Sequence, residues 1–135
     1  MSKENTNLAS EFLVLSTLQR LGANALLTLG HHKAVDIAVV VRPGKTKTVD
    51  VKGAATRDWF LDNVTRFRKN HFIVFVAFSN QIRNLQVRPE IYVVPSQAVP
   101  RMTYTSPGSK SRKVVRLTTL RNSGRRYRDR WNLLM

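Results

Sequence analysis

Hydrophobic and polar positions alternate most regularly between residues 35 and 53, and this stretch organises the rest of the chain. Apolar residues fill every second position from Val35 to Val41, and a second alternating run ends at Lys52. Between them, the Pro-Gly pair of segment 42–45 suits the central positions of a turn. Because strand side chains point alternately to opposite faces, the pattern predicts a two-stranded hairpin with Asp50 and Lys52 on one face.

An amphipathic helix is predicted over residues 7–21. Its N-cap is expected among Asn5, Thr6 and Asn7, and Gly22 is expected to end it. The apolar stripe at helical spacing consists of Leu8, Leu15 and Leu18, with Phe12 and Leu21 beside it. Glu11 falls inside this stripe, where a carboxylate is costly unless it is paired or binds a metal. Glu11 is therefore either an edge residue that reaches solvent or an arginine, or a metal ligand.

The remaining apolar runs predict the other strands of a mixed sheet. Residues 24–29 form a short strand, residues 71–79 a nearly all-apolar strand buried on both faces, and residues 90–94 the next strand. The expected minor elements are a helical turn at 58–63, a short helix after Pro95 with Ser96 as a candidate cap, an edge strand at 114–117 and a helical turn at 117–120. We expect one domain over 1–135, with a core at about 8–96 and a basic extension at 101–135.

The charge of the chain points to a polyanionic partner. The 135 residues include 23 Lys and Arg against 8 Asp and Glu, a formal net charge of +15. Residues 101–135 alone carry ten basic residues and one Asp. Nucleic acid is the commonest polyanion. An anionic membrane is a weaker alternative, because the sequence has no amphipathic basic helix or lipidation motif.

Other compositional features exclude several protein classes. The chain has no cysteine, which excludes disulfides and thiolate metal sites. Its apolar runs are far shorter than the roughly 20 residues of a membrane span. The polar first residues lack the apolar core of a signal peptide. We therefore expect a cytoplasmic protein.

Several basic segments are candidates for nucleic-acid binding. Between residues 57 and 69, basic and aromatic residues interleave, which suits stacking on bases or, more commonly, packing under a loop. The adjacent His31 and His32 are a poor zinc pair, because neighbouring residues of an extended chain point apart and His71 has no suitable spacing to them. The candidate nucleic-acid-binding residues are His31, His32, Lys33, Arg57, Arg66, Arg68, Lys69, Lys110, Arg112, Lys113, Arg125 and Arg126.

The predicted hairpin concentrates charge at one point. If Asp36 pairs near Asp50, two carboxylates and the Lys52 ammonium share one location. Two such carboxylates repel each other unless a cation lies between them, which favours a divalent metal with oxygen ligands, above all Mg²⁺. The alternative is an exposed cross-strand ion-pair pattern, which stabilises a sheet by about 0.2–1 kcal/mol.

These residues resemble the PD-(D/E)xK nuclease superfamily. The matching segments are Ser10-Glu11-Phe12-Leu13, Gly30 to Asp36, Val49-Asp50-Val51-Lys52-Gly53, I-Y-V-V-P-S at 91–96 and, more loosely, Y-x-D-x-W from Tyr127 to Trp131. The chain is most similar to the branch of archaeal Holliday-junction resolvases and its uncharacterised bacterial relatives. It departs from the usual pattern in Val35, where the family has Pro, and in Asp50, where Glu is commoner.

The resemblance implies a restriction-endonuclease-like α/β fold, with a central mixed sheet of about five strands flanked by helices in an αβββαβ core. It implies a Mg²⁺-dependent endonuclease, with Mn²⁺ as a substitute, that acts as a homodimer on branched or structured DNA. Asp36, Asp50 and the carbonyl of Val51 would bind the metal, Glu11 would contact the metal or its water, and Lys52 would orient the attacking water. The alternatives are an RNA-processing nuclease and a non-catalytic nucleic-acid binder, which has no need of this residue set.

Overall fold

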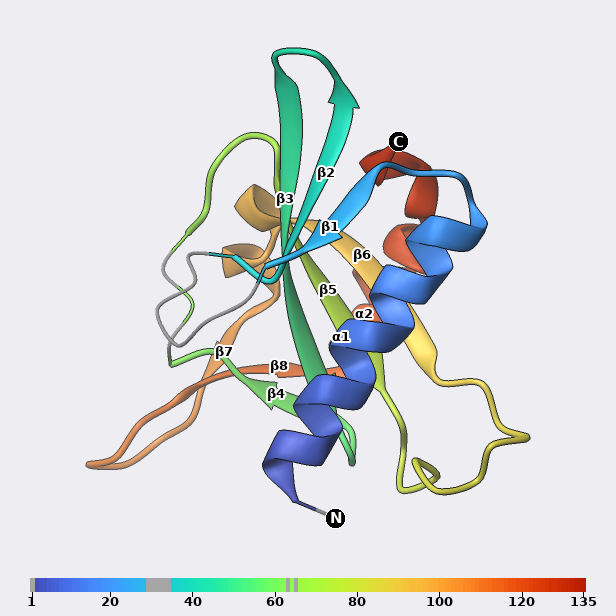
Figure 1. The fold of residues 1–135 in the computed structure, drawn as a ribbon. Coiled ribbons are helices and arrows are strands. Elements are labelled where there is room, and N and C mark those ends of the chain that lie inside the picture. Colours follow the sequence, from blue (N-terminus) through green and yellow to red (C-terminus); the bar gives the residue numbers. More distant parts are fainter. Residues whose placement is uncertain (1, 29–34, 63, 65) are drawn as a thin grey trace.

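A five-stranded mixed sheet forms the centre of the computed structural model, which describes residues 2–28, 35–62, 64 and 66–135 (Figure 1). Its strands, in spatial order, are β1 (Ala25–Leu27), β2 (Ile37–Arg42), β3 (Lys45–Ala54), β5 (His71–Ala77) and β6 (Glu90–Pro95). β3 and β5 are parallel, whereas the other neighbours are antiparallel. The predicted α/β class and the mixed sheet of about five strands are confirmed.

The hairpin of β2 and β3 forms as the alternating pattern predicts. Arg42 pairs with Lys45 across a two-residue turn, and Gly44 has a φ of +82°, in the left-handed region that glycine adopts most easily. β5 is buried along its whole length, as the apolar run at 71–79 predicts. Val49 and Val51 of β3 pack against α1, so the intervening Asp50 points to the opposite face.

The first helix, α1 (Lys3–Arg20), packs on one face of the sheet (Figure 1). It begins earlier than predicted, because the hydroxyl of Ser2 caps it by accepting from the backbone N–H of Asn5 at 3.0 Å. The predicted apolar stripe is confirmed at Leu18 and, in part, at Leu15, which packs against the core, but the fully buried residues are Thr6, Ser10, Val14 and Leu18. Leu8 and Phe12 are 44% and 53% exposed.

Small residues at the helix–sheet contact explain this orientation. A Cβ atom added to Gly53 of β3 would lie 2.0 Å from the Oγ of Ser10, so the backbones approach closely only because Gly53 has no side chain. The Ser10 hydroxyl donates to the carbonyl of Thr6 at 2.7 Å, four residues back in the helix. Its burial therefore leaves no hydrogen-bonding group unsatisfied.

A second, three-stranded sheet covers the opposite face, in the order β4 (Asp58–Phe60), β8 (Lys113–Arg116) and β7 (Tyr104–Thr105). The helical turn predicted at 58–63 is wrong, because the described part of that segment contains β4. The strand expected at 114–117 is present as β8, but it is the central strand of this sheet and not an edge strand. Trp59 is the physical reason: it pairs with Val115 and packs edge-on against Phe75, with ring centroids 5.1 Å apart. The crossover from β3 to β5 thus contains β4, where the resemblance implies a helix.

The C-terminal part of the chain completes both faces of the core. Its elements are η1 (Ser96–Ala98), η2 (Pro100–Met102), α2 (Leu117–Asn122), η3 (Arg125–Tyr127) and η4 (Trp131–Leu134). Ser96 is not a helix cap, because its hydroxyl both donates to and accepts from the backbone of Arg68 at 2.9 Å. Trp131 and Leu134 are buried, as the apolar residues of the tail predict. None of the helices in the described ranges is long and apolar enough to cross a membrane.

Candidate active site

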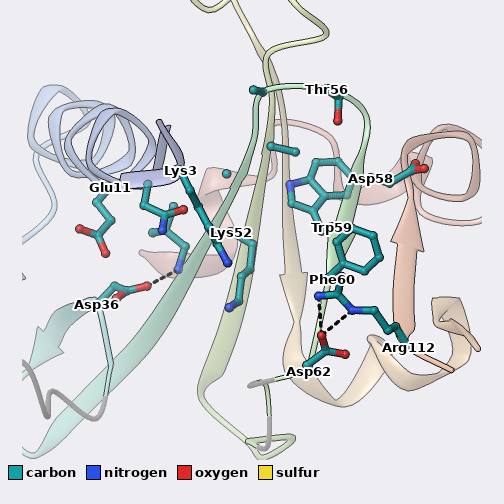
Figure 2. Close-up of a pocket in the computed structure, with 15 residues that line it drawn as sticks. Lys3, Glu11, Asp36, Lys52, Thr56, Asp58, Trp59, Phe60, Asp62 and Arg112 are labelled. Carbon is teal, nitrogen blue, oxygen red and sulfur yellow. Dashed lines mark hydrogen bonds and ion pairs between the residues drawn. The ribbon is translucent and has the colours of Figure 1, made fainter. Parts of the chain in front are cut away.

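A cleft of about 830 Å³ lies between the N-terminal half of α1 and the second sheet, over the end of β3 (Figure 2). Its lining residues are Lys3, Asn7, Glu11, Asp36, Val51, Lys52, Gly53, Ala54, Ala55, Thr56, Asp58, Trp59, Phe60, Asp62 and Arg112. Three of the four predicted catalytic residues, Glu11, Asp36 and Lys52, therefore face one cavity, although they come from three separate segments of the chain.

Asp36 is fixed at the point where β2 and β3 separate. Its backbone N–H donates to the carbonyl of Val49 at 3.0 Å. Its carboxylate Oδ2 then accepts the backbone N–H of Val51 at 2.7 Å. The side chain thus takes the place of a further ladder hydrogen bond, and it anchors the carboxylate against the strand that carries Lys52.

Glu11 approaches the same corner of the cleft from α1. Figure 2 shows the carboxylates of Glu11 and Asp36 on one side of the cleft, with the side chains of Lys3 and Lys52 extending beside them. Glu11 is partly exposed at the margin of the buried helix face, so the predicted position inside a core-facing stripe is wrong. Solvent access at this margin lowers the cost of keeping the carboxylate charged.

Asp50 shares a strand face with Lys52, but it is not among the residues that line the cleft. Its Oδ2 lies 3.1 Å from Nε2 of His71, and Nδ1 of His71 lies 2.7 Å from the hydroxyl of Thr48. His71 is only 1% exposed. The buried imidazole of His71 therefore fixes the Asp50 carboxylate from the interior of the protein. The sequence placed His71 at the start of a strand and gave no sign of this contact, since the parallel register that brings it beside Thr48 joins distant segments.

The cleft provides part of an oxygen-ligand set for a metal ion. Mg²⁺ is commonly held by one or two carboxylates and keeps several water ligands. Glu11 and Asp36 meet that requirement, and the carbonyl of Val51 lies on the neighbouring strand. Across the residues with described positions, no group of three or more His, Cys, Asp or Glu side chains is gathered closely enough to hold a metal ion.

Arg112 forms part of the wall opposite Glu11 (Figure 2). Its Nε and Nη2 both donate to Oδ2 of Asp62, at 2.8 and 2.6 Å. Its guanidinium carbon lies 3.7 Å from the ring centroid of Phe60. Arg112 is one of the predicted nucleic-acid-binding residues, but Asp62 was not predicted as its partner, because it is fifty residues away in the chain.

The other candidate nucleic-acid-binding residues lie elsewhere. Of those that the structure describes, Arg112 alone lines the cleft. Arg126 lines a smaller pocket together with Arg101 and Tyr127. The candidates that are exposed outside the cleft are Arg57, Arg68, Lys69, Lys110, Lys113 and Arg125. Arg66 is partly buried, whereas His31, His32 and Lys33 lie outside the described residues.

Comparisons with known proteins identify a structural neighbour. No protein-family model matches this chain, and no curated protein matches it. Among solved structures, the bacterial homing endonuclease I-Ssp6803I is similar, with a TM-score of 0.60 and 18% sequence identity. The similarity covers 98% of this chain and 91% of that one. The chain therefore shares its fold with an endonuclease over nearly its whole length.

Proposed function

We propose that this protein is a DNA endonuclease that hydrolyses phosphodiester bonds with the help of Mg²⁺, for which Mn²⁺ can substitute. The observation that carries the proposal is the convergence of Glu11, Asp36 and Lys52 in one cleft of a chain with a net charge of +15. A shared fold with a homing endonuclease supports it. The whole-chain charge suits a nucleic-acid ligand.

The chemistry of the cleft fits this reaction. Phosphodiester hydrolysis needs an activated water, stabilisation of the charge that develops on the phosphate, and in-line geometry. A bound divalent ion supplies Lewis acidity and lowers the pKa of a water. In the proposed mechanism Asp36 and Asp50 would hold the ion with the carbonyl of Val51 as a neutral ligand, and Glu11 would contact the ion or its water. The Lys52 ammonium orients the attacking water and offsets the negative charge of the transition state.

The finer features of the proposal concern substrate and assembly. The sequence resemblance favours branched or otherwise structured DNA, whereas the neighbour is described as a homing endonuclease. Cutting both strands of a duplex requires two active sites, so the proposal includes a homodimer. The alternatives are an RNA-processing nuclease and a binding protein that has lost activity.

The test is cleavage of labelled linear duplex, single strand, flap, four-way junction and RNA hairpin with Mg²⁺ or Mn²⁺. Asp36→Asn is expected to lower cleavage by about 10²-fold or more, the range for the loss of a group that stabilises a transition state. It should retain binding, because it removes a negative charge from the cleft. Asp129→Asn is the matched control: Asp129 is exposed and pairs with Arg88 away from the cleft.

Each outcome of the cleavage assay supports a different one of these three functions. Cleavage of DNA that is lost in Asp36→Asn and kept in Asp129→Asn supports the endonuclease and identifies its substrate. Cleavage restricted to the RNA hairpin supports the RNA-processing alternative. Tight binding without cleavage of any substrate by the wild-type protein refutes the enzyme and leaves the non-catalytic binder.

A further inference from the structure

The outer face of the second sheet carries an unusual pattern of side chains. Phe60, Val114 and Tyr104 are direct partners across β4, β8 and β7, so their side chains share one face. The next residues along the strands, including Trp59 and Val115, point into the core. Even so, Phe60 and Tyr104 remain 49% and 40% exposed on the outer face.

Each of these two rings is covered by an arginine from the β8 segment. The guanidinium carbon of Arg112 lies 3.7 Å from the Phe60 centroid, and that of Arg116 lies 4.0 Å from the Tyr104 centroid. Arg112 and Arg116 alternate with Val114, so they lie on the same side of the sheet. We call Phe60, Tyr104, Arg112, Val114 and Arg116 the arginine–aromatic face.

Stacking prepares these arginines to bind an anion. A guanidinium that lies flat on a ring keeps its N–H donors at the edges, where they match the oxygens of a phosphate. The ring also restricts the rotation of a long side chain, so less conformational entropy is lost on binding. Arg112 is held further by Asp62, which takes two of its five N–H donors and leaves three for a ligand.

The arginine–aromatic face adjoins the cleft. Phe60 and Arg112 line the cleft opposite Glu11 (Figure 2). Arg116 lies four residues further on, roughly 13 Å along an extended strand. The β7–β8 hairpin projects from the body of the protein (Figure 1), and its connecting residues add Lys110 without any acidic residue. Asp58 is the direct partner of Arg116 across β4 and β8, so the face carries one carboxylate beside its two arginines. A polyanion in the cleft would lie next to this face.

We propose that the arginine–aromatic face binds the sugar–phosphate backbone of duplex DNA beside the cleft, with Arg112 and Arg116 as ligands of two phosphates. The choice of DNA as the ligand depends on the function proposed above. The binding itself does not require that the protein cleaves DNA.

The test measures binding of a labelled duplex in EDTA, so that cleavage plays no part. The double variant Arg112→Gln/Arg116→Gln is expected to bind at least tenfold more weakly. Because each phosphate contact adds about 0.9 to the slope of log K against log salt concentration, the slope should decrease in magnitude by about 1.8. Arg20→Gln/Arg88→Gln is the control. Those arginines line a different groove, and Arg88 is paired with Asp129 as Arg112 is with Asp62.

Lysine variants separate geometry from charge. Arg112→Lys/Arg116→Lys keeps both charges but loses the planar donors and the stacking. Compared with the glutamine pair, this variant should recover most of the salt dependence of binding but not the full affinity for duplex DNA. Equal losses in the glutamine pair and in the control pair would overturn the proposal. A larger loss for single-stranded DNA than for duplex would also overturn it, and would indicate stacking of unpaired bases on the rings.

These results are distinguishable from a failure of the proposed function. If the face variants weaken binding but no substrate is cleaved by the wild type, the DNA-binding face stands and the endonuclease is refuted. If the wild type cleaves DNA and the face variants bind like the control, the endonuclease stands and this inference is wrong.

Discussion

His71 holds Asp50, a predicted metal ligand, from inside the protein, because its imidazole bridges Thr48 and the carboxylate of Asp50. Side chains that orient metal ligands commonly affect metal affinity or activity by 10–100-fold when they are replaced. Under the proposed mechanism, His71→Ala should weaken Mn²⁺ binding to the DNA-free protein by about that factor, as measured by calorimetry. His71→Asn, which keeps a short polar side chain, should recover part of the affinity.

Thr48→Val is the matched control for this prediction, since it removes the hydrogen bond to the far ring nitrogen and leaves the Asp50 contact in place. It should affect Mn²⁺ binding less than His71→Ala does. Unchanged Mn²⁺ affinity in a folded His71→Ala protein would show that the His71–Asp50 pair serves only the stability of the sheet.

A second group of interacting side chains, on β6 and α2, makes the stability of the protein depend on pH. Arg121 donates to the Glu90 carboxylate, and these hydrogen bonds hold the pKa of Glu90 below its ordinary value. The Tyr92 hydroxyl donates to the same carboxylate at 2.9 Å, and burial, with help from this bond, raises the pKa of Tyr92 to about 12.

Stability should therefore fall at alkaline pH. Between pH 10, the ordinary pKa of tyrosine, and pH 12, the unfolded chain loses the Tyr92 proton while the folded protein keeps it, so the free energy of unfolding decreases as pH rises. Denaturant titrations across this range should show the decrease in the wild type and a smaller one in Tyr92→Phe. At acid pH the sign is opposite: the Glu90 contribution is lost as pH falls below 4.5, and Glu90→Gln should show less of that loss.

At the scale of elements, the contact between α1 and β3 sets the position of Glu11. Gly53→Ala would place a methyl group 2.0 Å from the Ser10 hydroxyl oxygen, so the helix must shift. We expect a loss of about 1–3 kcal/mol in the free energy of unfolding, the usual range for overpacking. Cleavage should fall as well, since Glu11 follows Ser10 directly. Chemical denaturation and an activity assay measure the two effects.

Removing the obstructing side chain tests the cause. In Gly53→Ala the substitution Ser10→Gly should restore both stability and activity in part, even though Ser10→Gly alone weakens the helix. If the double variant is as impaired as the two single changes added together, the Ser10–Gly53 contact does not position the helix.

Local patterns predicted the elements whose neighbours are close in sequence. The β2–β3 hairpin and the buried β5 strand follow from alternation and from continuous apolar composition. The buried face of α1 did not, because Thr6 and Ser10 count as polar in a periodic pattern although their hydroxyls bond within the helix. β4 was also missed, since the contact of Trp59 with Phe75 joins remote segments.

The residues of the candidate site were also predicted only where the contacts between them are local in sequence. The hairpin pattern predicted one location for Asp36, Asp50 and Lys52, and the cleft contains Asp36 and Lys52 but not Asp50. Glu11 stood out by its position on the helix, and the resemblance gave it a role. The partner of Asp50 could not be inferred, because His71 reaches it through the parallel pairing of β3 with β5. Arg112 was recognised only as one basic residue among many, because its contact with Asp62 depends on the second sheet.

At the scale of the whole molecule, we expect DNA binding and catalysis to depend on different charged groups. The cleft combines the carboxylates of Glu11, Asp36, Asp58 and Asp62 with the cations of Lys3, Lys52 and Arg112, whereas the protein as a whole carries a net charge of +15. Chelation by EDTA should therefore abolish cleavage but leave most of the DNA binding, which filter binding at fixed salt can measure. Cleavage that persists in EDTA would contradict a metal-dependent mechanism.

Because β3 pairs with β5 in parallel, we expect the site to assemble in two stages during folding. Asp36 reaches Val51 through a hairpin contact between residues fifteen apart, whereas docking of β5 and α1 requires the closure of longer loops, which is slower. The Asp36 half of the cleft should thus form before the Glu11 half. In refolding kinetics, changes in the hairpin should slow folding, and Gly53→Ala should mainly accelerate unfolding. A newly collapsed chain would then present the Asp36 carboxylate before it presents a complete active site, which delays any nuclease activity until the native packing is reached.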